Sequence, residues 1–327
     1  MRACSTPLAL VLVAGVPLGQ ERLLDPAHEL LPYDTRETRD VAAADFDGDG
    51  AVDLFLARYG PNTVLVGNGA AYFEDTGLVP GFDESSFRVA LGDLDGDEDV
   101  DALLANGVDP NRLYLWGPTG FGDGTTQLPL QTIPRMSNDV ALGDVDNDGD
   151  LDAYYANTLF PLPGFGELPD QLLINDGFGV FTDGSSLLPP DFNDTQGAAF
   201  GDVDEDGDLD LYLANGPSGV LLDARNELLL GDGAGGFVKG ALSVDAVSSN
   251  DVVLVDVDAD GHLDVLVANG GGLVVQNQLL LGDGAGGFAE APGLLPADVD
   301  NTWTITVADL DGDGALDFVA GNSEPDR

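Results

Sequence analysis

The chain has 327 residues, of which 43% are hydrophobic, and 59 Asp and Glu against 11 Lys and Arg give it a formal net charge of −48. A charge of this size repels nucleic acid and anionic membranes, and it favours cationic partners, metal ions first. Acid-rich disordered chains lack apolar residues, whereas here Leu, Val, Ala and Phe are interleaved with the acids, so we expect a folded protein.

The first predicted element is a secretory signal peptide over residues 1–20. It has one early Arg and then an uncharged run rich in Leu, Val and Ala that is too short to span a bilayer. The only cysteine, Cys4, falls inside it, so disulfides are not expected in the mature chain. No other run predicts a membrane span. We therefore expect the protein to be secreted, extracellular or on the cell surface, with one folded domain over 21–327.

A nine-residue acidic loop recurs six times in this domain. Every copy has Asp at positions 1, 3, 5 and 9 and Val or Leu at position 8, and successive copies begin 48 to 58 residues apart. The copies are 45–53 (DFDGDGAVD), 93–101 (DLDGDEDVD), 144–152 (DVDNDGDLD), 202–210 (DVDEDGDLD), 256–264 (DVDADGHLD) and 309–317 (DLDGDGALD). A fixed period of this length indicates a repeat architecture with one structural unit per copy.

Each unit carries four short apolar strands around this loop. One strand precedes the loop and one follows it, a third opens with an amide residue, as in 226–232, and a Gly-rich turn leads to a Phe-containing fourth, as in 232–237. Four-stranded antiparallel units at this period predict an all-β fold, a β-propeller. The last unit stops after its second strand. Because 22–32 resembles the fourth-strand region of a unit, the N-terminus is a candidate for closing the ring, which would have six blades, or seven if the chain is incomplete.

The composition of the loop predicts calcium binding. Ca²⁺ takes six to eight oxygen ligands in flexible geometry. Side chains at positions 1, 3, 5 and 9 and the backbone carbonyl at position 7 supply most of such a shell, and Gly at position 6 permits the positive φ that curls the loop. Glu98 replaces this Gly in the second loop. The predicted ligand residues for up to six structural ions are Asp45, Asp47, Asp49, Ala51 and Asp53; Asp93, Asp95, Asp97, Asp99 and Asp101; Asp144, Asp146, Asp148, Asp150 and Asp152; Asp202, Asp204, Asp206, Asp208 and Asp210; Asp256, Asp258, Asp260, His262 and Asp264; and Asp309, Asp311, Asp313, Ala315 and Asp317.

Two other interpretations of the loop fit less well. An EF-hand needs a bidentate Glu at position 12 and flanking helices. Position 12 is occupied here by Leu56, Leu104, Tyr155, Leu213, Val267 and Ala320. A merely solvated acidic run has no reason to keep an apolar residue at position 8 in six copies, so a structural metal loop is the better interpretation.

The D-x-D-x-D-G-x-x-D loop between apolar strands, with "ANG" and "N-x-L-x-L" runs after it, resembles the FG-GAP or VCBS repeats of integrin α-subunit-like β-propellers. This group includes secreted proteins similar to cartilage acidic protein. The resemblance covers roughly 22–322 and implies Ca²⁺ in the loop between the first two strands of each blade, usually in a seven-bladed ring. It also implies recognition of protein or matrix partners in some members and of glycans in others.

Catalysis is not expected from the residue inventory. The histidines are His28 and His262, the second inside an acidic loop, and Cys4 lies in the signal region, so Ser-His-Asp and Cys-His machinery are disfavoured. The leading hypothesis is a non-catalytic binding or adhesion module for a protein or glycan. The alternatives are a polysaccharide lyase or hydrolase, or its carbohydrate-binding propeller, and a purely structural repeat domain.

Partner binding is predicted on the face opposite the calcium loops. Since the strands alternate in direction, the acidic loops and the Gly-rich turns share one face and the longer connections share the other. The longest are 158–170, with Phe160 and Phe165, and 216–225. Exposed loop aromatics on a rigid scaffold suit binding, although they could equally pack onto the blade. Trp116 and Trp303 fall at strand-like positions and are expected to pack rather than bind.

Overall fold

The computed structural model describes residues 37–69, 72–107, 109–131, 135–158, 169–190, 193–216, 225–242, 248–270, 275–297 and 301–322. The predicted signal peptide at 1–20, the ring-closing segment at 22–32 and the side chains of Phe160 and Phe165 lie outside these ranges. Within them, no helix is long and apolar enough to cross a membrane.

The described chain is built from short strands in six sheets, with two single-turn 3₁₀ helices. The first three sheets contain β1 (Thr38–Ala44), β2 (Asp53–Arg58), β3 (Thr63–Gly67) and β4 (Phe73–Asp75); β5 (Ser86–Gly92), β6 (Asp101–Asn106), β7 (Arg112–Leu115) and β8 (Gly122–Asp123); and β9 (Ser137–Gly143), β10 (Asp152–Asn157), β11 (Gln171–Asn175) and β12 (Phe181–Asp183). The last three contain β13 (Thr195–Gly201), β14 (Asp210–Asn215), β15 (Glu227–Gly231) and β16 (Phe237–Lys239); β17 (Ser249–Val255), β18 (Asp264–Asn269), β19 (Gln278–Gly282) and β20 (Phe288–Glu290); and β21 (Thr302–Ala308) with β22 (Asp317–Asn322). The 3₁₀ helices are η1 (Thr125–Gln127) and η2 (Ser185–Leu187).

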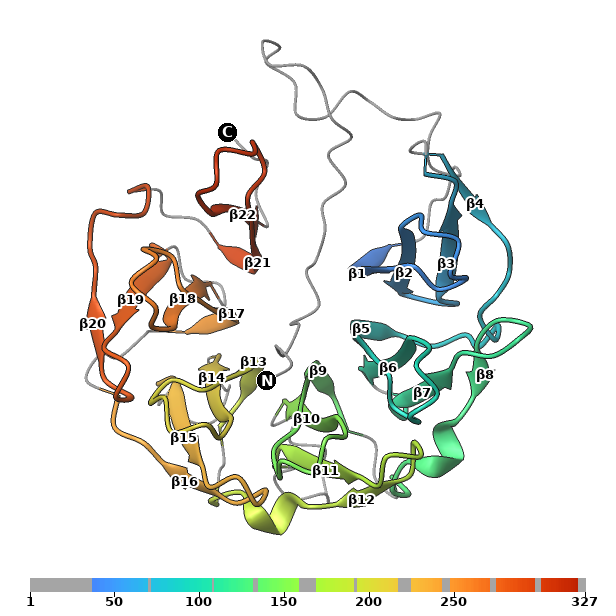
Figure 1. The fold of residues 1–327 in the computed structure, drawn as a ribbon, viewed down its shortest axis with the longest axis horizontal. Helices are drawn as coiled ribbons and strands as arrows, with labels where there is room; N and C mark the ends of the chain where they lie inside the picture. Colours follow the sequence, from blue (N-terminus) through green and yellow to red (C-terminus); the bar gives the residue numbers. More distant parts are fainter. Residues whose placement is uncertain are drawn as a thin grey trace.

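The sheets form a β-propeller. Strands follow one another in sequence order within each sheet, and all neighbours are antiparallel. The first strand of each sheet lies nearest the centre, and the sheets follow one another around it (Figure 1). The predicted all-β propeller of four-stranded antiparallel blades is thus confirmed. Five sheets have four strands, and the sixth has two within the described residues, as expected for a last unit that stops after its second strand.

The second strand of each blade explains why the blades stack. All six residues of β6, β10, β14 and β18 are buried, because neighbouring sheets cover both faces of these strands. Trp116 packs on Phe46 and Phe121, as predicted for a packing residue. Trp303 in β21 is 53% exposed, so the predicted packing is only partial there, since no further sheet follows on that side among the described residues.

An ion cluster around Arg88 ties the blades together at the centre. Arg88 comes from β5, and its guanidinium lies 3.8 Å from a carboxylate oxygen of Asp40, 3.7 Å from one of Asp139 and 3.2 Å from one of Asp251. It also donates a hydrogen bond to Thr304 Oγ1 at 3.3 Å. These five residues come from the first strands of five different blades, so a single side chain connects most of the ring.

The three aspartates of this cluster also bind the backbone of the next blade. Asp40 accepts the N–H of Val89 at 3.0 Å, and Asp139 accepts that of Ala198 at 2.9 Å. Asp251 accepts the Ile305 N–H at 3.0 Å in the same way. Each carboxylate therefore neutralises part of the Arg88 charge and fixes the position of one strand against the next.

Candidate metal centre

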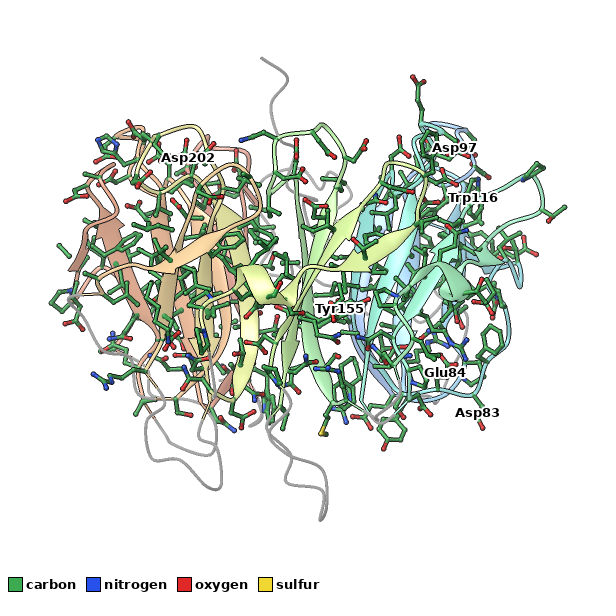
Figure 2. The ribbon with its side chains drawn as sticks, turned by 90° about the horizontal axis from the view of Figure 1, so that it is seen from below. Asp83, Glu84, Asp97, Trp116, Tyr155 and Asp202 are labelled. Atoms are coloured by element: carbon green, nitrogen blue, oxygen red, sulfur yellow. The ribbon has the colours of Figure 1, made fainter. Side chains whose placement is uncertain are left out.

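The six acidic loops each connect the first and second strands of a blade, and they lie on one face of the propeller. Asp97 and Asp202, from two of these loops, lie on one side of the disc, and Asp83 and Glu84 lie on the other (Figure 2). The Gly-rich turns share the loop face, as predicted, because Gly235 donates its N–H to the Val145 carbonyl at 3.0 Å. The same face thus carries both hairpin ends of a blade.

The carboxylate at position 1 curls each loop around itself. In the first loop Asp45 accepts the N–H of Asp49 at 3.1 Å and that of Gly50 at 2.8 Å. The carboxylate at position 5, here Asp49, accepts the N–H of Ala51 at 2.7 Å. Equivalent bonds at position 1 form on Asp144, Asp202, Asp256 and Asp309. These hydrogen bonds therefore curl the loop even without a bound cation.

Two residues in each loop have positive φ. At position 6 these are glycines such as Gly50, at φ +86°, except for Glu98, at φ +72°, a conformation that has a steric cost for a residue with a Cβ. The other is position 4, which the sequence analysis did not identify. It holds Gly48, Gly96, Asn147, Glu205, Ala259 and Gly312. In the sequence, the three Gly and one Asn at position 4 of the six copies were the pattern from which this positive φ could have been predicted.

The aspartate at position 9 is buried between strands. Asp101 is fully buried, and its carboxylate accepts the N–H of Leu94 at 2.9 Å and that of Trp116 at 2.7 Å. Burial raises the pKa of Asp101 to about 7, against the lowering effect of these two bonds. Burial likewise raises the pKa of Asp152 to about 7 and that of Asp210 to about 6. A nearby cation would favour the charged forms of these groups.

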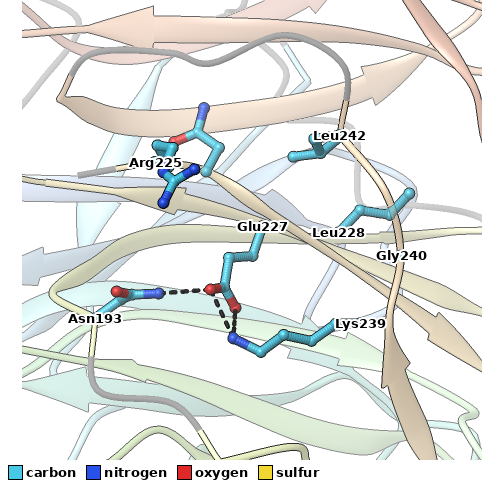
Figure 3. A pocket seen from close by; sticks show the side chains of 8 residues that line it. Asn193, Arg225, Glu227, Leu228, Lys239, Gly240 and Leu242 are labelled. Carbon is cyan, nitrogen blue, oxygen red and sulfur yellow. Dashed lines mark hydrogen bonds and ion pairs between the residues drawn. The ribbon is translucent and has the colours of Figure 1, made fainter. Parts of the chain in front are cut away.

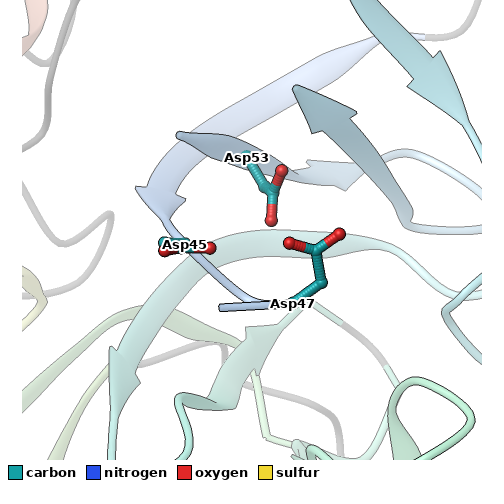
Figure 4. A group of neighbouring side chains, drawn as sticks. All are labelled: Asp45, Asp47 and Asp53. Atoms are coloured by element: carbon teal, nitrogen blue, oxygen red, sulfur yellow. The ribbon is translucent and has the colours of Figure 1, made fainter. Parts of the chain in front are cut away.

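The carboxylates converge as a metal site requires. In each of the first three loops, one oxygen from positions 1, 3 and 9 lies within 4.8 Å of the other two, and in the fourth and fifth loops the same holds for positions 1, 3 and 5. Figure 4 shows Asp45, Asp47 and Asp53 turned toward one another. Three of the four residues predicted to ligate through side chains are thus brought together in each of these five loops. Ligation by the fourth side chain and by the carbonyl at position 7, and the site in the sixth loop, stay predictions.

Two oxygens show that the donor set fits a cation. Asp95 Oδ1 and Asp146 Oδ1, both at position 3, are buried and have no hydrogen-bond partner. Burial raises the pKa of both side chains, and the carboxylates beside them raise it further. Buried oxygens without protein partners are usually satisfied by an ion or an ordered water, and these two lie among converging carboxylates. Because the neighbouring donors are all oxygen, a hard divalent cation such as Ca²⁺ fits.

Basic residues are segregated from this face. Every Lys and Arg of the described residues comes from the parts of the blades directed away from the acidic loops. They are Arg39, Arg58, Arg88, Arg112, Arg135, Arg225 and Lys239. Several are paired with acids there, such as Arg112 with Glu84. The loop carboxylates therefore have no Lys or Arg beside them in the described chain, although His262 contacts Glu205 there. Most of the counter-charge has to come from solution.

Comparisons with known proteins agree with this geometry. Residues 45–104, 93–155 and 256–320, together more than half of the chain, match the FG-GAP-like repeat. Cartilage acidic protein 1 of Mus musculus is 29% identical over 192 residues, and that of Xenopus tropicalis 30% over 190 residues. Each match covers 55% of this chain but only 29% of the relative.

Solved structures show the same fold at low sequence identity. An Agrocybe aegerita lectin that recognises non-reducing terminal N-acetylglucosamine aligns with a TM-score of 0.54 and 16% identity, over 88% of this chain and 71% of the lectin. BBS1N in complex with ARL6DN aligns with a TM-score of 0.56 and 11% identity, over 91% and 79% of the two chains. These two structures support the propeller fold alone. The repeat match over more than half of the chain shows that it belongs to the family of FG-GAP-like repeat proteins.

Proposed function

We propose that this protein is a secreted, calcium-stabilised β-propeller that acts as a non-catalytic binding module. The observation that supports it best is the buried, unpartnered oxygen of Asp95 and of Asp146 inside loops of converging carboxylates. Secretion is supported by the signal-like residues 1–20. The similarity to cartilage acidic protein 1 agrees with a repeat protein of this acidic type.

In this proposal the role of calcium is structural. Position 9 joins the loop to the third strand, as Asp53 does by accepting the N–H of Phe46 at 2.9 Å and that of Gly67 at 2.8 Å. A cation held by this carboxylate and by positions 1 and 3 would link the loop to two strands of the blade. Without the cation the same carboxylates repel one another, so metal binding adds its free energy to folding.

The test is thermal unfolding of the full chain with calcium and with excess EGTA. We expect chelation to lower the melting temperature by about 10 °C or more, because several sites each contribute on the order of 1–3 kcal/mol at saturating calcium. Mg²⁺ at the same ionic strength is the control for general screening. An unchanged melt in EGTA would contradict the structural role.

For the ligand we propose a pocket on the face opposite the loops, which we call the Glu227 pocket (Figure 3). Its volume is about 260 Å³. It is lined by Asn193, Arg225, Asn226, Glu227, Leu228, Lys239, Gly240 and Leu242. Glu227 opens β15 at the strand end away from the loop 202–210, so the pocket lies on the predicted binding face.

The chemistry of the Glu227 pocket suits a saccharide. Lys239 donates to both carboxylate oxygens of Glu227, at 2.7 and 2.8 Å, and Asn193 donates to one of them at 2.9 Å. The charges of Lys239 and Glu227 largely cancel, so the pocket offers directed hydrogen bonds beside the apolar side chains of Leu228 and Leu242. Adjacent hydroxyl groups on an apolar ring match such a lining.

Binding to an array of immobilised glycans, with calcium present, tests this assignment. We expect Glu227→Gln and Lys239→Met to lose at least about tenfold in affinity, because each leaves a polar partner unpaired. Glu74→Gln, on the exposed side of β4, is the matched control and should bind normally. A protein partner that binds both pocket variants unchanged would contradict the saccharide assignment.

The proposal also specifies that no reaction follows binding. Incubation with acidic polysaccharides should leave the numbers of unsaturated and reducing ends unchanged. Appearance of either kind of end in the presence of calcium, and its loss in EGTA, would favour a polysaccharide lyase or hydrolase instead.

A further inference from the structure

Side chains join the acidic loops of three successive blades. The residue at position 4 of one loop reaches the residue at position 7 of the next. Asn147 Nδ2 donates to Asp208 Oδ1 at 2.8 Å, which connects the third loop to the fourth. The carboxylate of Glu205 contacts Nδ1 of His262, which connects the fourth loop to the fifth. The fourth loop, 202–210, is therefore bonded to both of its neighbours.

The other loops lack the side chain that would make this contact. Position 4 is Gly48 in the first loop, Gly96 in the second, Ala259 in the fifth and Gly312 in the sixth. None of these residues can form a side-chain hydrogen bond. The direct connection is thus confined to the loops 144–152, 202–210 and 256–264.

The Gly-rich turns enclose each connection. A Cβ added at Gly233 would lie 2.2 Å from Asp208 Oδ1 and 2.7 Å from Asn147 Nδ2. One added at Gly284 would lie 2.3 Å from His262 Nδ1. Both contacts are solvent-exposed, but the backbone of a Gly-rich turn lies directly against one partner of each, which restricts the position of that side chain. A shift in one loop is therefore expected to reach the next.

We propose that calcium binding to the third, fourth and fifth loops is cooperative and that the contacts Asn147–Asp208 and Glu205–His262 carry the coupling. This inference rests on the proposed calcium function. Position 4 lies between the predicted ligands at 3 and 5, and position 7 supplies a predicted carbonyl ligand. Ordering one loop around its ion therefore fixes the residue that positions the next loop. The next loop then loses less conformational entropy when it binds its own ion. By thermodynamic reciprocity, each filled loop favours the other.

Electrostatic repulsion between the bound ions acts against this effect. The loop 202–210 carries five Asp and Glu205, so it keeps a net negative charge with one divalent ion bound. Filling it still removes two negative charges from the field at its neighbours, so the coupling measured between the loops is the ordering effect less this screened repulsion.

The first experiment compares variants at position 4. In calcium titrations of the full chain, amide hydrogen exchange followed by mass spectrometry reports each loop separately, and calorimetry reports the sum. We expect the third, fourth and fifth loops to gain protection over one narrow calcium range. Asn147→Gly should separate the third loop from the fourth, with a shift in midpoint of about fivefold. Glu205→Gly should do the same for the fourth and fifth.

The fold should tolerate these variants, because three other loops already have Gly at this positive-φ position. Ala259→Gly is the matched control, since it changes the same position where no contact exists. If Asn147→Gly and Glu205→Gly leave the midpoints of the three loops as close together as in the unmodified chain, the coupling proposal is wrong.

A second experiment empties one loop at a time. Asp202→Asn with Asp204→Asn should raise the calcium midpoints of the third and fifth loops by several-fold. Asp309→Asn with Asp311→Asn, which empties the sixth loop, should leave the fifth unchanged. Unaltered third and fifth loops after emptying the fourth would overturn the coupling alone. If no loop of the unmodified chain gains protection with calcium, the metal assignment itself fails, and the coupling with it.

Discussion

Aspartates crowd together in two regions of this propeller, and the two regions balance their charge differently. At the centre, Asp40, Asp139 and Asp251 surround Arg88 and also accept backbone N–H groups from the next blade. In the loops, four or more acids share a nine-residue segment with no Lys or Arg beside them among the described residues. The centre contains its own cation, whereas the loops depend on one from solution. The central connection should therefore persist under chelation, while the loop face should loosen.

Removing the central cation should have the largest effect. Arg88→Met leaves three largely buried carboxylates without their counter-charge, which we expect to cost about 3–5 kcal/mol in the free energy of unfolding. Urea unfolding in saturating calcium measures this cost while the loops stay filled. Arg39→Met is the control, because Arg39 is exposed and, among the described residues, pairs with Glu37 and lies over the rings of Tyr59 and Phe87. Equal, small losses in both variants would mean that Arg88 does not hold the ring together.

Within the third loop, substitutions at positions 9 and 7 should have different effects on the free energy of unfolding. Asp152 is fully buried, and its carboxylate accepts two backbone N–H groups. Asp152→Asn replaces one of these oxygens with an NH₂ group, which is itself a donor and cannot accept the backbone N–H that it faces. We expect a loss of about 1–3 kcal/mol. Asp150→Asn should change stability by less than about 0.5 kcal/mol, because only the carbonyl of Asp150 is predicted to ligate. Both are measured by urea unfolding, and a larger effect for Asp150→Asn would reverse the roles assigned to these positions.

Relieving the strain in the second loop should stabilise the protein. Glu98 has φ +72°, where a residue with a Cβ pays a steric cost, so Glu98→Gly should gain about 1–2 kcal/mol. The reverse change, Gly149→Ala, serves as the control. A Cβ at Gly149, at φ +101°, would meet nothing within 4 Å, so any loss there reflects the backbone alone. If Glu98→Gly destabilises the protein, Glu98 makes a contribution that outweighs its strain.

A pH dependence is also expected at the centre. Burial raises the pKa of Asp139 to about 6, against the lowering effect of Arg88, from an ordinary value of 3.8. A raised pKa means that the proton stabilises the fold below about pH 4 and that this contribution is lost as the pH rises through 6. In calcium, the stability of the unmodified protein relative to Asp139→Asn should fall by about 2 kcal/mol between pH 4 and pH 7. If the stability difference between the two proteins stays constant from pH 4 to pH 7, Asp139 does not titrate in this range.

Much of the fold and of the loop could be predicted from the sequence, because both repeat. Strand positions follow from the apolar runs that flank 45–53 and its five copies, and the registered aspartates indicate the metal loop. The shared face of loops and Gly-rich turns follows from alternating strand directions and is confirmed by the bond from Gly286 N–H to the Val203 carbonyl. Local periodicity was sufficient for these features.

The central cluster could not be predicted in the same way. Asp40, Arg88 and Asp251 lie far apart in the chain, and only the closure of the blades around one centre brings them together. The cross-loop contacts depend likewise on the spacing of neighbouring blades. A comparison of equivalent positions across the six units would have shown an Arg among aspartates in the first strands, but not that they meet.

The segregation of charge gives the disc an electric dipole along its axis in the metal-free state. One face carries the acidic loops, and the described Lys and Arg residues lie toward the other face or, in the case of Arg88, at the centre. In the field of a charged surface the molecule would rotate before contact, turning its loops toward a cation-rich surface and its opposite face toward a polyanion. Salt shortens the range of this alignment, to about 8 Å at physiological ionic strength. Calcium binding reduces the dipole moment, so filling the loops would also weaken the preference for one orientation of approach.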